Sequence, residues 1–498
     1  MAEPYKIVVG LEVHVQLLTR TKLFCGCKNQ FGLPPNSATC PVCLGLPGTL
    51  PVMNQTAFRL ALRAALALNC QIAGFTKWDR KNYYYPDLPK NYQISQYDLP
   101  FSHDGFLEIN VHADPKKGHT PKRIGIIRAH LEEDAGKNLH DESGRGGNTL
   151  VDLNRTGTPL LEIVSHPDLN TPEEAISYLE EVRLMLRELG VSDCEMQEGS
   201  LRCDANVNVH VPMAGEPTGY AATPLVEVKN LNSFRAVGRA IRYEAQRQYE
   251  QFQKDPQNYR IGKLLKTTAG WDDAKGRTEV QRHKEEAADY RYFPEPDLVP
   301  VVVSKEQVEA VKAEMGELPS QQRTRLQSQY GLTPYDADVL TAKGRKLVAY
   351  FEAVAVALGG DGKQAVNRLS DLVFPALTER KEEIEAFPVS AADFAGFVTG
   401  TGPLSKQDRV DLFKHMLANG VGLAAAMDAT GIKPQTFDEG ALRAAVVAAI
   451  GANAKAVADF KAGKTAAANK IKGEVMKANK GAPNDLVQRL LDEELARL

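Results

Sequence analysis

The sequence predicts an α+β protein whose strand-rich first part is followed by two all-helical parts. Three observations support this fold class. Residues 7–18 alternate between apolar and polar side chains with a period of two, as a half-buried strand does. Strand-like patterns recur until about residue 300 and then vanish, after which alanine-rich helical patterns continue to about residue 430. A chain of 498 residues is long enough for about three domains, which we expect at residues 1–300, 301–430 and 431–498.

The composition is typical of a globular protein. Hydrophobic residues make up 43% and charged residues 25% of the chain, and the formal net charge is −3. That charge gives no global attraction to nucleic acid, so any such binding must depend on local patches. The first residues lack the basic and apolar regions of a leader, and no apolar run approaches 18 residues, so we expect a cytoplasmic protein without a membrane span.

The first predicted strand places two chemically useful side chains on its polar face. Glu12 and His14 lie two residues apart, roughly 6–7 Å between Cα atoms. A carboxylate and an imidazole at this spacing can hold one divalent cation or position an oxygen atom for transfer chemistry. The same pattern is also typical of a strand with one solvated face.

Four cysteines follow this strand in two close pairs, Cys25 with Cys27 and Cys40 with Cys43. Two such pairs predict a tetrahedral zinc site, and four thiolates leave no open position, so we expect a structural zinc rather than a catalytic one. The other cysteines, Cys70, Cys194 and Cys203, have no partner at ligand spacing, so we expect buried thiols.

A helix is predicted after Asn54, which can cap it, and a tyrosine-rich segment follows at residues 79–98. Its five tyrosines are interleaved with Arg80, Lys81 and Lys90. Such a segment can form a surface loop that stacks on bases and meets phosphates, or the edge of a core.

Further carboxylates end later predicted strands. Residues 124–137 turn from apolar to acidic at Glu132, Glu133 and Asp134, and Glu162 closes another strand-like run. If three consecutive carboxylates are enclosed, a metal ion or a strongly basic partner is expected. Residues 198–209 again alternate like a strand and add Asp204 and Asn206 to the polar residues.

The later chain is predicted to be helical. Thr171, followed by proline and two glutamates, predicts the start of a helix that ends at Gly190. Residues 289–297 are interpreted as a hinge because strand patterns stop soon after them. Seven lysines between residues 455 and 480 fit contact with a phosphate backbone, although a solvated lysine face is the commoner meaning.

Several catalytic motifs are absent from the sequence, and this excludes the enzyme classes that depend on them. The sequence has no Walker-type phosphate loop and no serine-nucleophile motif, and no cysteine has glutaminase surroundings. If the chain uses nitrogen from an amide donor, another polypeptide must release it.

Taken together, the motifs resemble the GatB family, the B component of tRNA-dependent amidotransferases. The resemblance covers the whole length and is carried by these blocks: GLEVH at 10–14, DRKNY at 79–83, YQISQ at 92–96, HLEEDAGK at 130–137, VDLNR at 151–155, GSLRCDAN at 199–206, KNLNS at 229–233 and DYRYFPEPD at 289–297. By resemblance, the first 300 residues form a mixed-sheet catalytic cradle with a kinase-like site, followed by a helical domain and a small tail domain that grip tRNA.

The resemblance also implies the reaction. The family uses ATP to phosphorylate the side-chain carboxylate of Glu-tRNA(Gln) or Asp-tRNA(Asn), and ammonia from a separate amidase component then displaces phosphate, with a small third component bracing the pair. Glu12, His14 and Glu133 are the implied Mg²⁺ ligands. Glu132, Glu162 and Asp204 are second candidates, and Lys81 and Arg202 could balance phosphate charge.

A non-catalytic, zinc-containing tRNA-binding adaptor is the alternative from another functional class. It explains the cysteines, the tyrosine-rich segment and the lysine-rich tail. It leaves the carboxylates and His14 without a purpose, so we favour the enzyme.

Overall fold

The structure is a computed structural model that describes residues 4–111, 120–139, 148–283, 290–402, 404–433, 438–462, 464–479, 482 and 484–497. By its internal contacts the chain divides into two compact units, Met1–Thr324 and Arg325–Leu498.

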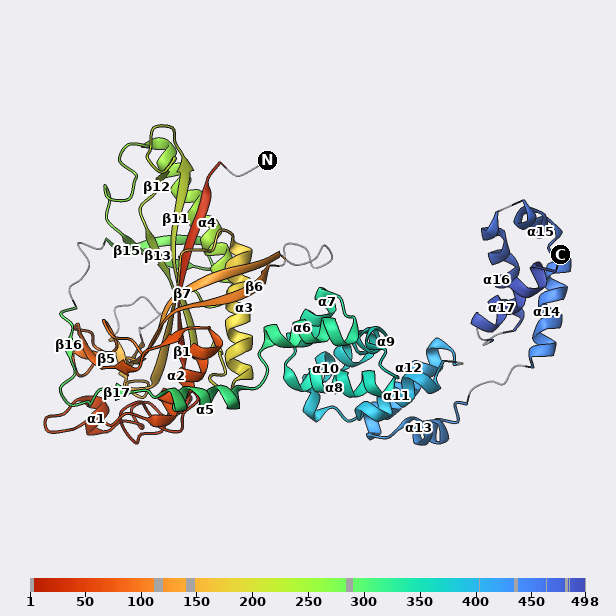
Figure 1. Cartoon of the computed structure of the whole chain (residues 1–498), viewed down its shortest axis with the longest axis horizontal. Coiled ribbons are helices and arrows are strands. Elements are labelled where there is room, and N and C mark those ends of the chain that lie inside the picture. Colours follow the sequence, from red (N-terminus) through yellow and green to blue (C-terminus); the bar gives the residue numbers. More distant parts are fainter. Residues whose placement is uncertain are drawn as a thin grey trace. The chain divides into compact units, whose positions relative to one another are not determined.

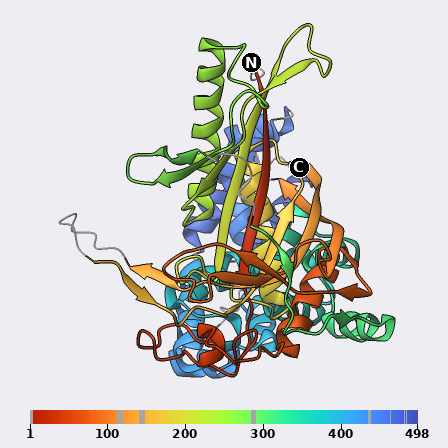
Figure 2. The ribbon, with the colours of Figure 1, turned by 90° about the vertical axis from the view of Figure 1, so that its left-hand side faces the viewer.

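Among the described residues, the first unit is built on a sheet of ten strands (Figures 1 and 2). Nine of them follow the order β15 (Arg277–His283), β14 (Thr267–Asp272), β13 (Val226–Lys229), β11 (Leu201–Pro212), β1 (Lys6–Gln16), β10 (Pro159–Ser165), β7 (Thr120–Glu133), β6 (Ser102–Val111) and β2 (Gln71–Ile72). The tenth, β12 (Tyr220–Ala222), pairs with β11. The β13–β14 pair is parallel and the other pairs are antiparallel, so the predicted mixed sheet is confirmed.

The central strand β1 explains how the sheet separates a core face from a polar face. Its apolar residues Leu11, Val13 and Val15 are fully buried, whereas Glu12 and His14 between them are partly exposed. The buried face packs with helices α2 (Gln55–Ala67), α3 (Pro172–Glu188) and α4 (Phe234–Lys254) in one core. The predicted starts of two helices are confirmed, because the Asn54 and Thr171 side chains accept hydrogen bonds from the first turns of α2 and α3.

A small sheet of three strands, β16 (Phe293–Pro294), β4 (Asp79–Asn82) and β5 (Tyr92–Ser95), also belongs to the first unit. The interpretation of residues 289–297 as a hinge is therefore wrong for the described part, because β16 pairs with β4 and the Arg80 guanidinium makes two hydrogen bonds to the Glu295 carboxylate, of 2.6 and 2.8 Å. Residue 289 lies outside the described residues.

Shorter elements complete the first unit. They are the pairs β3 (Phe75–Thr76) with β17 (Val301–Val302) and β8 (Lys137–Leu139) with β9 (Leu150–Asp152), and the helices α1 (Pro41–Leu44) and α5 (Lys305–Met315). Helix α6 (Pro319–Tyr330) runs across the boundary between the units. The first core extends beyond residue 300, because Val311 and Met315 of α5 are buried in it.

The described residues of the second unit are helical and contain two hydrophobic cores. The first core involves α7 (Pro334–Thr341), α8 (Arg345–Ala357), α9 (Gly362–Arg368), α10 (Phe374–Arg380), α11 (Ala391–Gly400), α12 (Lys406–Asn419) and α13 (Leu423–Thr430). The second involves α14 (Glu439–Ala452), α15 (Ala454–Lys461), α16 (Ala468–Ala478) and α17 (Asn484–Leu495). The expectation of all-helical structure after the mixed sheet is confirmed.

None of the helices in the described ranges is by itself long and apolar enough to cross a membrane. Helices α14 and α15 reach that length only as a pair bent by 86°.

Candidate functional site

The polar face of the large sheet collects most of the residues predicted for the site. In the antiparallel ladders around β1, His14 lies opposite both Glu162 of β10 and Arg202 of β11, and Glu12 lies opposite Asp204. Directly opposed residues project from the same face of a sheet. Five candidates, from three strands that are far apart in the sequence, therefore lie on one surface.

The first group on this surface consists of His14, Glu132 and Glu162. Each offers one ligand atom, and these atoms lie within 4.8 Å of one another. His14 Nε2 is 3.4 Å from a carboxylate oxygen of Glu162, and Nε2 of the buried His130 is 3.6 Å from the same oxygen. Two carboxylates and an imidazole at this separation can hold one divalent cation.

The charge state of the first group indicates a need for a cation. Burial would lower the pKa of His14, but the hydrogen bond and charge of Glu162 outweigh it and raise the pKa to about 8. Burial lowers the pKa of His130 to about 4, so this imidazole is neutral at neutral pH. Burial also raises the pKa of Glu132, which the charge of Lys81 offsets only in part. A proton on His14 therefore holds the positive charge that a metal ion would supply.

The second group consists of Glu12, Asp204 and Glu227, whose ligand atoms also lie within 4.8 Å of one another. Asn206 Nδ2 donates a hydrogen bond of 2.8 Å to Glu12. The Lys229 ammonium pairs with Asp204 at 2.5 Å and with Glu227 at 2.9 Å. Lys266 also lies 3.7 Å from Glu227, so two lysines offset part of the negative charge of this second group.

Two predicted cations flank these groups. Burial would lower the pKa of Lys81, which projects from β4, but the charges of Glu132, Tyr292 and Glu162 raise it above its usual value. Arg202 donates a hydrogen bond of 2.6 Å to the buried Asp134, which also accepts one of 2.9 Å from Gln16. Lys81 therefore remains a charged group close to the first carboxylates, whereas Arg202 is anchored beside them.

The structure does not bring Glu133 together with Glu12 and His14. Its carboxylate pairs with Lys90 and accepts the backbone N–H of Ile94 at 2.9 Å. A β-bulge explains this placement: the pairing of β7 with β10 shifts between Ile126 and Arg128, so β7 contains one extra residue there. Beyond the bulge the buried positions change from Ile124 and Ile126 to Ala129 and Leu131, and Glu132 is the residue that joins the polar face.

Sequence reasoning missed Glu227 and Lys229 as members of the site. Both lie on β13, where they alternate with the buried residues Val226 and Val228. The same period of two that indicated Glu12 and His14 is therefore present in residues 226–229. That strand is too short, at four residues, for its pattern to stand out before a long helix.

The four predicted zinc ligands do come together. The sulfur atoms of Cys25, Cys27, Cys40 and Cys43 lie within 4.8 Å of one another, so the cluster could bind a metal ion and is compatible with structural zinc. Helix α1 begins directly after Cys40 and ends at Gly45, which adopts a left-handed conformation with φ of 68°. The three remaining cysteines are buried, as expected.

A buried lysine supports the fit of these cysteines to a metal. Lys22 is fully buried, and its ammonium donates a hydrogen bond of 2.7 Å to the carbonyl of Ala38 and lies 3.7 Å from the sulfur of Cys43. The hydrogen bond with Cys25, against the cost of burial, lowers the pKa of Cys43 to about 5, and Lys22 acts in the same direction. A tetrathiolate metal centre carries a net negative charge that a buried ammonium would compensate.

The tyrosine-rich segment combines both expected environments. Tyr84 and Tyr85 are exposed at 74% and 59%, whereas Tyr83 is partly buried against Tyr290. Tyr97 stacks on Tyr292 with ring centroids 4.1 Å apart. This segment therefore has both solvent-facing rings and rings packed on residues 290–292.

Two family models and several named relatives match this chain. Residues 7–309 match the family model described as the GatB/GatE catalytic domain, and residues 349–495 match the one described as the GatB domain. Relatives named as the B subunit of aspartyl/glutamyl-tRNA(Asn/Gln) amidotransferase include one from Rhodopirellula baltica, 49% identical over 99% of this chain and 98% of the relative. Another, from Carboxydothermus hydrogenoformans, is 45% identical over 99% of both chains. The chain therefore belongs to the GatB family.

Proposed function

We propose that this chain is the component of a tRNA-dependent amidotransferase that uses ATP to activate the side-chain carboxylate of Glu-tRNA(Gln), Asp-tRNA(Asn) or both, and then amidates it. The observation that carries the proposal is the pair of carboxylate groups on one sheet face, flanked by Lys81, Arg202 and Lys229. The names of the relatives support the same reaction. A partner amidase supplies the ammonia, a small third protein completes the complex, and the reaction takes place in the cytoplasm with translation.

The proposed Mg²⁺ ligands are His14, Glu132 and Glu162, with Glu12, Asp204 and Glu227 as a second set. Magnesium bound there would neutralise phosphate oxygens of ATP and stabilise the charge that develops as the phosphoryl group is transferred. Glu133 is left out of the set because its carboxylate is already held by Lys90 and Ile94. The four cysteines hold a structural zinc ion.

The side chains of this face have distinct roles in the two steps. Lys81 and Lys229 are positioned to attract phosphate charge while the substrate carboxylate attacks the terminal phosphate of ATP and releases ADP. Arg202 keeps Asp134 and Gln16 in place beside them. Ammonia then attacks the acyl phosphate, loses a proton and displaces phosphate, which leaves the amide.

The test is amide formation by this chain, co-purified with its partners, on each mischarged tRNA with ATP, Mg²⁺ and ammonium chloride in place of glutamine. Ammonium bypasses the amidase, so we expect product, and we expect Glu162→Gln to remove it. Glu108→Gln is the matched control, because Glu108 lies exposed on β6 of the same sheet in a pair with Arg123. No product from a complex that still binds tRNA would favour a non-catalytic adaptor instead.

A further inference from the structure

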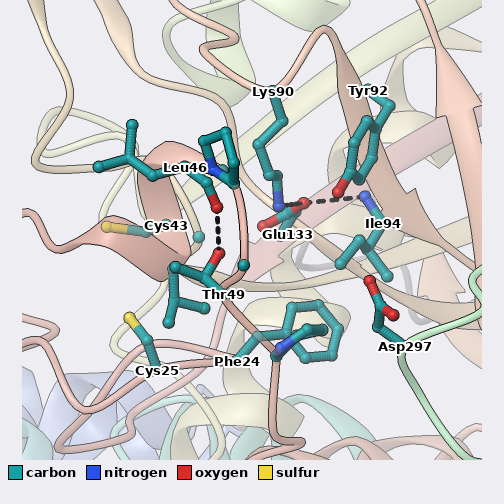
Figure 3. A pocket seen from close by; sticks show the side chains of 16 residues that line it. Phe24, Cys25, Cys43, Leu46, Thr49, Lys90, Tyr92, Ile94, Glu133 and Asp297 are labelled. Carbon is teal, nitrogen blue, oxygen red and sulfur yellow. Dashed lines mark hydrogen bonds and ion pairs between the residues drawn. The ribbon is translucent and has the colours of Figure 1, made fainter.

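A cavity of about 200 Å³ lies between the cysteine cluster and the end of β7 (Figure 3). Cys25 and Cys43 line it from the cluster, Glu133 lines it from the end of β7, and Lys90 lines it from the loop before β5. The Lys90 and Glu133 side chains are only 5% and 2% exposed, and they form an ion pair. Burying an ion pair costs desolvation free energy, so the presence of this pair indicates a structural or functional role.

The cysteine turn, which we define as residues 40–45 with Cys40 and Cys43, fixes the position of Lys90. Gly45 ends helix α1 with φ of 68°, and a Cβ atom at this position would overlap the Cγ atom of Lys90. Glycine is therefore the residue that lets the lysine stem pass against the turn. The link between the cluster and Lys90 is a direct packing contact.

Lys90 in turn fixes the strand that carries a proposed metal ligand. The Glu133 carboxylate is held by Lys90 and by the Ile94 N–H at 2.9 Å, and its carbonyl accepts a hydrogen bond of 2.6 Å from Gln93. Successive side chains of a strand project to opposite faces. Glu133 therefore points into the cavity while Glu132, on the same stretch of backbone, points to the polar face.

We infer that Gly45, Lys90 and Glu133 are positioning residues that transmit the geometry of the cysteine turn to Glu132. The inference rests on the proposed function, because it assumes that Glu132 is a metal ligand. Metal sites require their ligands to be held within about 0.5 Å, and losing a supporting contact typically costs about 10- to 100-fold in metal affinity. The cysteine cluster then stabilises the position of the catalytic groups as well as the conformation of its own loop.

The test measures equilibrium binding of Mn²⁺, as a spectroscopic substitute for Mg²⁺, to the purified complex without tRNA or ATP. We expect Lys90→Met to weaken Mn²⁺ binding about 10-fold, and Lys90→Arg to restore most of it because the ion pair is kept. Gly45→Ala should weaken binding similarly. Gly48→Ala is its matched control: Gly48 also has a positive φ, of 85°, but a Cβ there would meet no atom within 4 Å.

A variant of the cysteine cluster tests the first contact in this series, which joins the cluster to Lys90. Cys27→Ser removes one metal ligand without altering the cavity lining, since Cys27 is not part of it. We expect it to lower the zinc content and to weaken Mn²⁺ binding. Combined with Lys90→Met it should cause little further loss, because both changes act through the same contacts.

Unchanged Mn²⁺ affinity in Lys90→Met and Gly45→Ala would overturn the inference, as would equal effects of Gly45→Ala and Gly48→Ala. Fully additive effects of Cys27→Ser and Lys90→Met would also overturn it. Failure of the proposed function gives a different result. In that case the Glu162→Gln variant binds Mn²⁺ with the same affinity as the wild-type protein.

Discussion

At the scale of single residues, a period of two predicted that Glu12 and His14 share a face, and Glu162 and Asp204 were recognised as strand carboxylates. What sequence could not show is the choice between Glu132 and Glu133. Counting alternate residues from Ile124 and Ile126 assigns Glu132 to the buried face and Glu133 to the polar one. One extra residue in β7, Ile127, reverses that assignment, and because it follows another isoleucine, Ile126, the sequence does not mark where the shift occurs.

Replacement of Glu12 separates chemistry from binding. Because Glu12 belongs to the second carboxylate group, we expect Glu12→Ala to lower the rate of ADP release with mischarged tRNA at least about 100-fold. Filter binding should show tRNA affinity within about 2-fold of the wild-type value, since the tail is unchanged. Equal loss of both activities would indicate a folding role instead.

Replacement of Lys22 tests the charge balance of the cysteine cluster. Lys22→Met keeps the length of the buried side chain but removes the ammonium beside Cys43. We expect zinc to be released to a colorimetric chelator about 10-fold faster, because one compensating charge is lost. The exposed Lys28→Met, on the same loop, serves as a control and should release zinc at the wild-type rate.

At the scale of elements, long and strongly patterned segments were predicted well. The capping residues Asn54 and Thr171 predicted where α2 and α3 begin, and the alternation of residues 7–18 predicted β1. The segment at 289–297 was misinterpreted because β16 has only two residues, too few to show a period. Its place is determined by partners more than 200 residues away, chiefly the contact of Glu295 with Arg80.

The buried contact between Glu295 and Arg80 is expected to contribute to the stability of the first unit. The Glu295 side chain is fully buried, so Glu295→Ala leaves the Arg80 guanidinium without its main partner. We expect the free energy of unfolding to fall by about 3 kcal/mol. Both tryptophans of the chain, Trp78 and Trp271, lie in the first unit, so urea unfolding followed by tryptophan fluorescence reports on it.

Asp297→Ala provides the comparison for this experiment. Asp297 is half-exposed and lies 3.4 Å from the same guanidinium, so its loss should cost less than about 1 kcal/mol. Equal effects of the two replacements would mean that the buried contact does not hold β16 in place.

At the scale of the whole molecule, the change from strand-like to helical sequence patterns predicted the order of a mixed-sheet region and helical regions. The exact domain limits at residues 300 and 430 stay predictions, and the contacts divide the chain after Thr324. The net charge of −3 means that attraction to tRNA must be local. The lysine-rich tail is the patch that we propose for this contact, and Lys470 and Lys477 are exposed on its helix α16.

Reversing charge on the tail should reveal its contribution to tRNA binding. We expect Lys470→Glu combined with Lys477→Glu to weaken tRNA binding and to reduce the slope of log affinity against log salt by about 2. Lys275→Glu, on an exposed turn of the first unit, should change neither. An unchanged salt dependence would mean that the lysines are only a solvated face.

The central position of β1 has a consequence for synthesis of the chain. Its partner residues on β11 lie about 190 residues later, so the ribosome needs roughly 10–40 s to deliver them. Until then the edge of β1 that pairs with β11 stays open even after β10 has been made, and it is a segment that other nascent chains can recruit. Folding of the first unit therefore cannot proceed from its beginning. A truncated translation product that ends before Leu201 lacks one neighbour of its central strand and is a substrate for aggregation or proteolysis.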